Sequence, residues 1–110
     1  MEDAQIVRVA KAIADPTRVE MLRALRRAGS MTCTEVCEHF ELSQPTISHH
    51  VRTLAKSGLI SVRKDGPFHM LTANEDVLAG FASVIAGEPS ARSARRSSRA
   101  KTKTGSPRKR

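Results

Sequence analysis

The sequence contains no tryptophan, no tyrosine, three phenylalanines and two cysteines among its 110 residues. It has no run of about 18 uncharged apolar residues, so no ordinary membrane-spanning helix is expected. The N-terminus carries Glu2 and Asp3 where a secretion signal would carry basic residues before an apolar stretch. We therefore expect a soluble cytoplasmic protein with reduced thiols and no membrane partner.

The sequence also lacks the residue patterns that carry most enzyme chemistry. No nucleophile with a matching base, no glycine-rich phosphate loop and no Cys-x-x-Cys pair is recognisable along the chain. We therefore expect no enzymatic activity, no catalytic residue and no cofactor.

Acidic residues are scarce at one end of the chain, and this imbalance produces the net charge of +8. Residues 1–87 contain ten basic and ten acidic residues, whereas residues 88–110 contain nine basic residues and one acid. The latter segment has no aromatic side chain and no aliphatic side chain larger than alanine, so burial cannot offset the entropy of ordering it. We predict one domain over 1–87 and a disordered basic tail over 88–110. The tail either adds sequence-independent affinity for DNA or only keeps the protein soluble.

The apolar spacing in residues 1–87 predicts a mostly helical domain with a small β-hairpin. Three- and four-residue spacings indicate five helices. The first spans 3–14 and the last 75–86; the second begins at 16 and is ended by Gly29, the third follows Thr32 and includes Phe40, and the fourth begins at 44 and is ended by Gly58. Strand-like runs at 59–64 and 68–72 flank Asp65-Gly66-Pro67, a sequence typical of a hairpin turn. The order α-α-α-α-β-β-α is that of a winged helix-turn-helix.

Capping residues support three of these helix starts. Asp15 precedes Pro16, a residue that suits the first helical position. Thr32 and Glu35 have the spacing of a capping box, and Ser43 can cap the helix that begins at 44. Thr72 or Asn74 is expected to cap the last helix.

The helix from 44 has an apolar face and a polar face. With Ile47, Val51 and Leu54 turned to the core, the opposite face can enter the major groove of double-stranded DNA. The side chains there are types that read base edges, and we predict this role for Gln44, Thr46, Ser48 and His49. Contacts to the DNA backbone are predicted for Ser43, Arg52, Arg63 and Lys64. An ordinary solvated surface remains the alternative for Arg52 and for the hairpin.

Three stretches resemble the ArsR/SmtB family of repressors. Residues 14–18 (ADPTR) resemble the start of that family's second helix, residues 42–51 (LSQPTISHHV) its recognition helix, and residues 57–60 (SGLI) the segment before its wing. The resemblance extends over about 4–85. It implies a homodimer built on the first and last helices, a palindromic operator, and repression relieved by an effector.

The first and last helices carry apolar residues that the small core does not obviously cover. We predict that they form the dimer interface, with internal packing of a monomer as the alternative. The residues concerned are Ile6, Val9, Ile13, Leu78, Phe81 and Ile85.

The sensor residues typical of the resembled family are missing. Thr32 and Thr34 stand where its metalloid-sensing pattern has two cysteines, and residues 75–86 contain no histidine. Cys33 and Cys37 lie four residues apart on one helix face, which leaves a two-thiol metalloid site or an oxidation switch open. Packing is the alternative for Cys37, whereas Cys33 is expected to have a pKa lowered by the helix dipole. Because two thiols leave a zinc site incomplete, no metal is assigned.

The histidines other than His49 are interpreted as structural. His50 lies next to Val51 near the apolar face and is expected to be packed and hydrogen-bonded, although base reading and metal binding stay open. His39 and His69 are interpreted as surface or packing residues.

The sequence thus predicts a homodimeric, sequence-specific DNA-binding repressor of a palindromic operator, acting on the nucleoid. One alternative is a sequence-tolerant architectural DNA-binding protein driven by the basic tail. Another is a repressor that senses metalloids or oxidants through Cys33 and Cys37. The identity of an effector, whether a small molecule or a protein partner, stays open.

Overall fold

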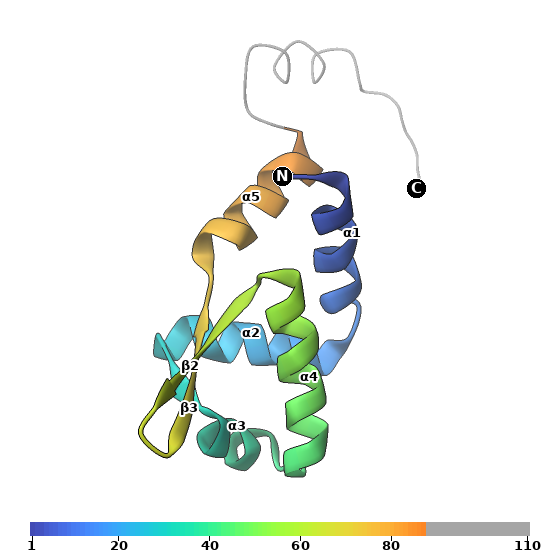
Figure 1. Ribbon diagram of the computed structural model, residues 1–110. Helices are drawn as coiled ribbons and strands as arrows, with labels where there is room; N and C mark the ends of the chain where they lie inside the picture. Colours follow the sequence, from blue (N-terminus) through green and yellow to red (C-terminus); the bar gives the residue numbers. More distant parts are fainter. Residues whose placement is uncertain (88–110) are drawn as a thin grey trace.

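The computed structural model describes residues 1–87, which form five helices and a three-stranded antiparallel sheet (Figure 1). The elements are α1 (Asp3–Ala12), α2 (Pro16–Ala28), β1 (Met31–Thr32), α3 (Cys33–Phe40), α4 (Gln44–Ser57), β2 (Ile60–Asp65), β3 (Phe68–Ala73) and α5 (Glu75–Ala86). This order confirms the predicted winged helix-turn-helix. The tail predicted for 88–110 lies outside the described residues. None of the helices over 1–87 is long and apolar enough to cross a membrane.

The three predicted helix caps are confirmed. The Asp15 carboxylate accepts a hydrogen bond from the Arg18 backbone N–H at 3.0 Å, and this bond lowers the pKa of that carboxyl. Thr32 and Glu35 make both bonds of a capping box. The Ser43 hydroxyl accepts from the Thr46 backbone N–H at 3.4 Å. Local side-chain chemistry therefore sets where α2, α3 and α4 begin.

Two helices differ from the prediction in detail. α1 ends at Ala12, two residues before the predicted end, and its buried residues are Val9 and Ala12. Asn74 occupies the N-cap position of α5, but its side chain makes no capping hydrogen bond.

The short strand β1 was not expected from the sequence. Met31 pairs with Leu71 and Thr32 with Met70, so β1 forms one edge of the sheet and β3 its centre. A strand of two residues is too short for alternation of polar and apolar side chains to be recognised.

The wing is a hairpin of β2 and β3 with a two-residue loop. Its register runs from Ile60 opposite Ala73 to Asp65 opposite Phe68, and Gly66 in the loop has a φ of 62°. Leu71 of β3 is fully buried, whereas residues 61–65 of β2 are all exposed. The hairpin thus projects from the body of the domain (Figure 1).

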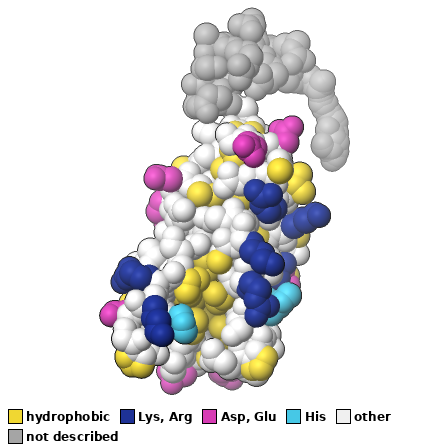
Figure 2. Space-filling view, viewed as in Figure 1, with side chains coloured by type: hydrophobic (Ala, Val, Ile, Leu, Met, Phe, Trp, Pro, Cys, Tyr) yellow, Lys and Arg dark blue, Asp and Glu magenta, His cyan; other side chains and the backbone are white. Residues whose placement is uncertain are grey.

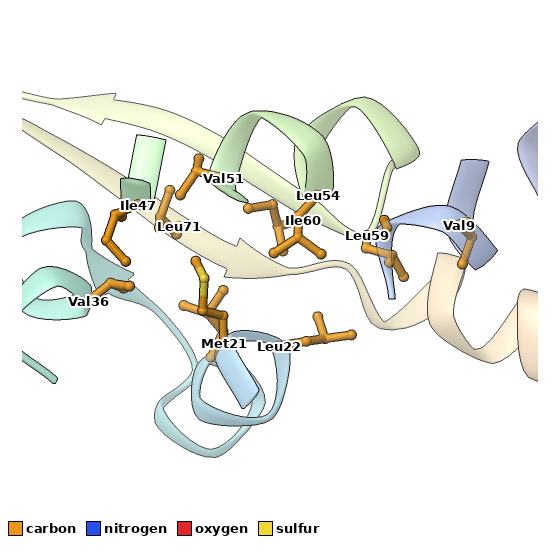
Figure 3. Close-up of a cluster of buried hydrophobic side chains, with 12 residues drawn as sticks. Val9, Met21, Leu22, Val36, Ile47, Val51, Leu54, Leu59, Ile60 and Leu71 are labelled. Atoms are coloured by element: carbon orange, nitrogen blue, oxygen red, sulfur yellow. The ribbon is translucent and has the colours of Figure 1, made fainter. Parts of the chain in front are cut away.

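The core lies between α2, α4 and the sheet, with α1 and α3 closing it at either end (Figure 3). Its members are Val9, Ala12, Met21, Leu22, Leu25, Val36, Ile47, Val51, Leu54, Leu59, Ile60 and Leu71. No residue of α5 is fully buried, although Val77, Leu78 and Phe81 pack partly against this cluster.

Candidate nucleic-acid interface

Helix α4 presents the polar face that the sequence predicts. Ile47, Val51 and Leu54 are buried, as expected, and this stripe fixes the rotation of the helix. The predicted base-reading side chains therefore lie on the outside: Gln44, Thr46 and His49 are exposed, and Ser48 is half-buried. The helix ends at Gly58, which adopts the left-handed conformation with a φ of 90°.

A tight turn joins α3 to α4 and positions the start of the recognition helix. Glu41 adopts a left-handed φ of 55°, and the Leu42 backbone N–H donates to the Cys37 carbonyl at 3.3 Å. The chain then enters α4 through Ser43, whose hydroxyl lies 2.9 Å from that of Thr46. The two hydroxyls and the first turn of α4 consequently form one polar end of the helix.

A thiol contacts one of the predicted base-reading residues. The Cys37 Sγ donates a hydrogen bond to the Gln44 Oε1 at 3.2 Å, across the turn from α3 to α4. Cys37 is half-buried, so it is not the fully buried packing residue that the sequence analysis considered. This contact engages the amide oxygen, one of the two side-chain atoms with which a glutamine reads adenine. The sequence alone gave no signal for it.

The expectation for Cys33 was wrong in direction. Burial, followed by the neighbouring Cys37 sulfur, raises the pKa of the Cys33 thiol. Removal from water disfavours the charged thiolate at this position, so the protonated thiol is favoured. Within residues 1–87, no group of three or more His, Cys, Asp or Glu side chains could hold a metal ion.

A groove of about 400 Å³ separates the recognition helix from the wing. Figure 2 shows its apolar floor, with basic and histidine side chains on both sides. Its lining residues are Cys33, Gln44, Ser48, Val51, Arg52, Ala55, Val62 and His69. Arg63 and Lys64, the predicted backbone contacts of the wing, are exposed on β2. The groove thus brings Arg52 and two of the predicted base readers opposite the wing.

Arg18 ties three helices together below this face. Its Nε donates to the Ala12 carbonyl at 2.6 Å, and one terminal nitrogen lies 3.2 Å from the Nδ1 of His50. Burial lowers the pKa of His50, opposed in part by Asp15. The neutral ring accepts a hydrogen bond from the guanidinium, since arginine can only donate. The predicted packed and hydrogen-bonded role of His50 is therefore confirmed.

The apolar residues of the terminal helices divide into two groups. Val9 has no exposed surface and belongs to the core of its own chain, so its predicted place in a dimer interface was wrong. Ile6, Ile13, Leu78 and Phe81 are half-buried, and Ile85 is 62% exposed. Sequence reasoning missed Val7 and Val84, which are 49% and 45% exposed. Periodicity identified the apolar face of α1 but not which neighbour covers each residue.

Several known proteins are similar to this chain in sequence and in fold. The family model described as bacterial regulatory protein, arsR family, matches residues 15–62. The arsenical resistance operon repressor of Staphylococcus xylosus is 36% identical over 78 residues, which span 71% of this chain and 74% of that protein. The transcriptional repressor SdpR of Bacillus subtilis is 43% identical over 70 residues, 64% and 77% of the two chains.

A solved structure gives the same result for the fold. The homodimeric winged helix-turn-helix DNA-binding domain Mb0332 of Mycobacterium bovis superposes with a TM-score of 0.65 at 26% identity. The match covers 77% of this chain and 84% of that one.

Proposed function

Because this chain belongs to the arsR family of bacterial regulatory proteins, we propose that it represses transcription by binding a specific sequence of double-stranded DNA. The observation that carries the proposal is the polar outer face of α4, presented by a helix that is capped, buried on its other side and preceded by a tight turn. Two relatives of this chain are named as repressors. A regulator of this kind acts on the nucleoid, in the cytoplasm, and requires no enzymatic activity.

The side chains of the interface divide into two roles. Gln44, Thr46, Ser48 and His49 read base edges in the major groove, where each base pair presents a distinct pattern of donors and acceptors. Ser43, Arg52, Arg63 and Lys64 contact the sugar-phosphate backbone and set the position of the helix. Both kinds of residue belong to one surface, since Gln44, Ser48 and Arg52 line the same groove of about 400 Å³ between α4 and the wing.

The repressor acts as a homodimer joined through α1 and α5. The exposed apolar residues at that end support this assembly, as does the homodimeric state of the Mycobacterium bovis domain. The interface consists of apolar residues of these two helices, namely Ile6, Val7, Ile13, Leu78, Phe81, Val84 and Ile85. A twofold dimer reads two half-sites about one helical turn apart, so the operator is palindromic.

Selection of bound duplexes from a random pool tests the proposal. We expect enrichment of one palindrome. Gln44→Ala should lower affinity for it by about 10- to 100-fold and relax preference at one position of each half-site. Gln5, the other glutamine of the chain, lies on α1 with its side chain beside Gly58, at the opposite end of α4 from Gln44, and Gln5→Ala serves as the matched control. Uniform recovery of all sequences would instead favour a sequence-tolerant architectural protein driven by residues 88–110.

A second candidate function, thiol-based sensing, is favoured by the hydrogen bond from Cys37 to Gln44. Oxidation or metalloid binding at Cys37 removes the S–H donor and frees the Gln44 amide to change its orientation. The selected duplex should then lose occupancy in the presence of peroxide or arsenite, and Cys37→Ala should be insensitive to both. Occupancy that ignores every additive in the wild-type chain would eliminate this candidate and leave the repressor without a thiol signal.

A further inference from the structure

A cluster of basic side chains lies on the side of the recognition helix away from the wing. Arg8 and Lys11 of α1 and Lys56 of α4 line a shallow pocket of about 200 Å³ with Thr53 and Ser57. Helices α1 and α4 pack against each other here. We call Arg8, Lys11 and Lys56 the basic ridge. Figure 2 shows basic side chains following the α1–α4 side of this face.

The ridge has no neutralising partner within residues 1–87. All three side chains are exposed, and none forms an ion pair with a described carboxylate. By contrast, Arg23 and Arg26 of α2 pair with Glu20 and Glu75, at 2.7 and 2.9 Å. Residues 1–87 carry equal numbers of basic and acidic side chains, yet the three cations of the basic ridge have no ion-pair partner among these residues and lie beside the recognition helix.

The position of the ridge along α4 indicates what it faces. The predicted base readers occupy the first half of α4, whereas Lys56 lies in its last turn, one turn beyond Arg52. The last half of α4 is the part that meets α1, one of the two helices proposed for the dimer. The basic ridge therefore lies between the predicted base readers and the twofold axis of the proposed dimer. The wing lies on the other side of the base readers (Figure 1).

We propose that the basic ridge binds the DNA phosphates between the two half-sites of the operator. The inference rests on the proposed function, since half-sites require a dimer that reads sequence. Phosphates are the complementary partner because three unpaired cations offer positive charge and N–H donors but no pattern for reading bases. Contacts to the DNA backbone thus lie on both sides of the base readers. The wing makes the contact far from the centre of the operator, and the basic ridge makes the contact near it.

The salt dependence of binding tests the ridge. Each phosphate contact contributes about 0.9 to the slope of log K against log salt concentration, through counterion release. In the full-length chain, Arg8→Gln with Lys11→Gln should reduce the slope of the dimer by up to about 3 to 4. The sequence of the selected palindrome should not change. Ethylation of phosphates between the half-sites should inhibit binding by the wild-type chain and lose that effect with the variant.

The matched control is Arg23→Gln with Arg27→Gln, which removes the same charge from the exposed face of α2. It should leave the slope and the ethylation pattern unchanged. Thermal unfolding verifies that both variants are folded. A ridge variant with the slope of the wild type, or equal losses in ridge and control variants, would overturn the inference. If no palindrome is enriched, the proposed function fails, and the same slopes on a random duplex show separately whether the ridge binds phosphate.

Discussion

Helices α4 and α5 are similar in length but differ in how far their own chain stabilises them. α4 has four buried residues and a serine side chain that caps its first turn. α5 is the more apolar helix, yet it has no buried residue and no side-chain cap. The structure of α4 is complete within one chain, so its outer face is free to recognise another molecule. α5 exposes apolar surface that a second copy can cover.

The largest expected effect comes from the buried side of α4. Leu54 has no exposed surface and lies at the centre of the core. Leu54→Ala should lower the free energy of unfolding by about 2–5 kcal/mol, because it removes buried methyl groups and leaves a cavity. Urea denaturation at a dilution that keeps the protein monomeric measures this loss. Ile85→Ala is the counterpart in α5, and a comparable loss there would contradict the contrast between the two helices.

The next effect concerns association through α5. Ile85 is 62% exposed in the single chain, so Ile85→Arg should be tolerated by the monomer. In the dimer it replaces a buried apolar side chain by a charge, which should weaken association by at least about 2 kcal/mol, or 30-fold. Sedimentation equilibrium measures the dissociation constant. Val62→Arg, at a β2 residue that is 43% exposed, should leave the dimer intact; dissociation by both variants would argue against a specific interface.

The same contrast explains how much the sequence could predict. α4 was predicted with its cap, its buried stripe and its glycine stop, because each depends on residues close together in the chain. For the terminal helices, periodicity identified an apolar face but assigned Val9 to the wrong neighbour. The raised pKa of Cys33 and the bond from Cys37 to Gln44 depend on tertiary packing, which sequence spacing does not describe.

A smaller effect is expected from the helix starts. Ser43→Ala removes the side-chain cap of α4 and should cost about 1 kcal/mol of the free energy of unfolding. Asn74→Ala changes the corresponding position of α5, where no capping bond exists, and should cost much less. Paired urea denaturation curves compare the two variants. Equal losses would mean that the capping hydrogen bond of Ser43 adds nothing to the free energy of unfolding.

The smallest expected effect is a dependence of the free energy of unfolding on pH. It arises from His50 in α4 and has no counterpart in α5, which contains no histidine. Burial lowers the pKa of His50 from its usual 6.5; Arg18 and His49 act in the same direction, while Asp15 opposes them. Well above pH 6.5 the ring is neutral in both the folded and the unfolded chain, so protonation of His50 takes nothing from the free energy of unfolding there.

Below pH 6.5 the unfolded chain binds the proton first, so the free energy of unfolding should fall as the pH decreases toward the lowered folded-state pKa. Urea denaturation between pH 7.5 and 5 measures the decline, which should be shallower in His50→Gln than in the wild type. His39→Gln removes an exposed histidine without touching Arg18 and should keep the wild-type decline. A decline of wild-type steepness in His50→Gln would show that the contact between α2 and α4 is not the origin of the pH dependence.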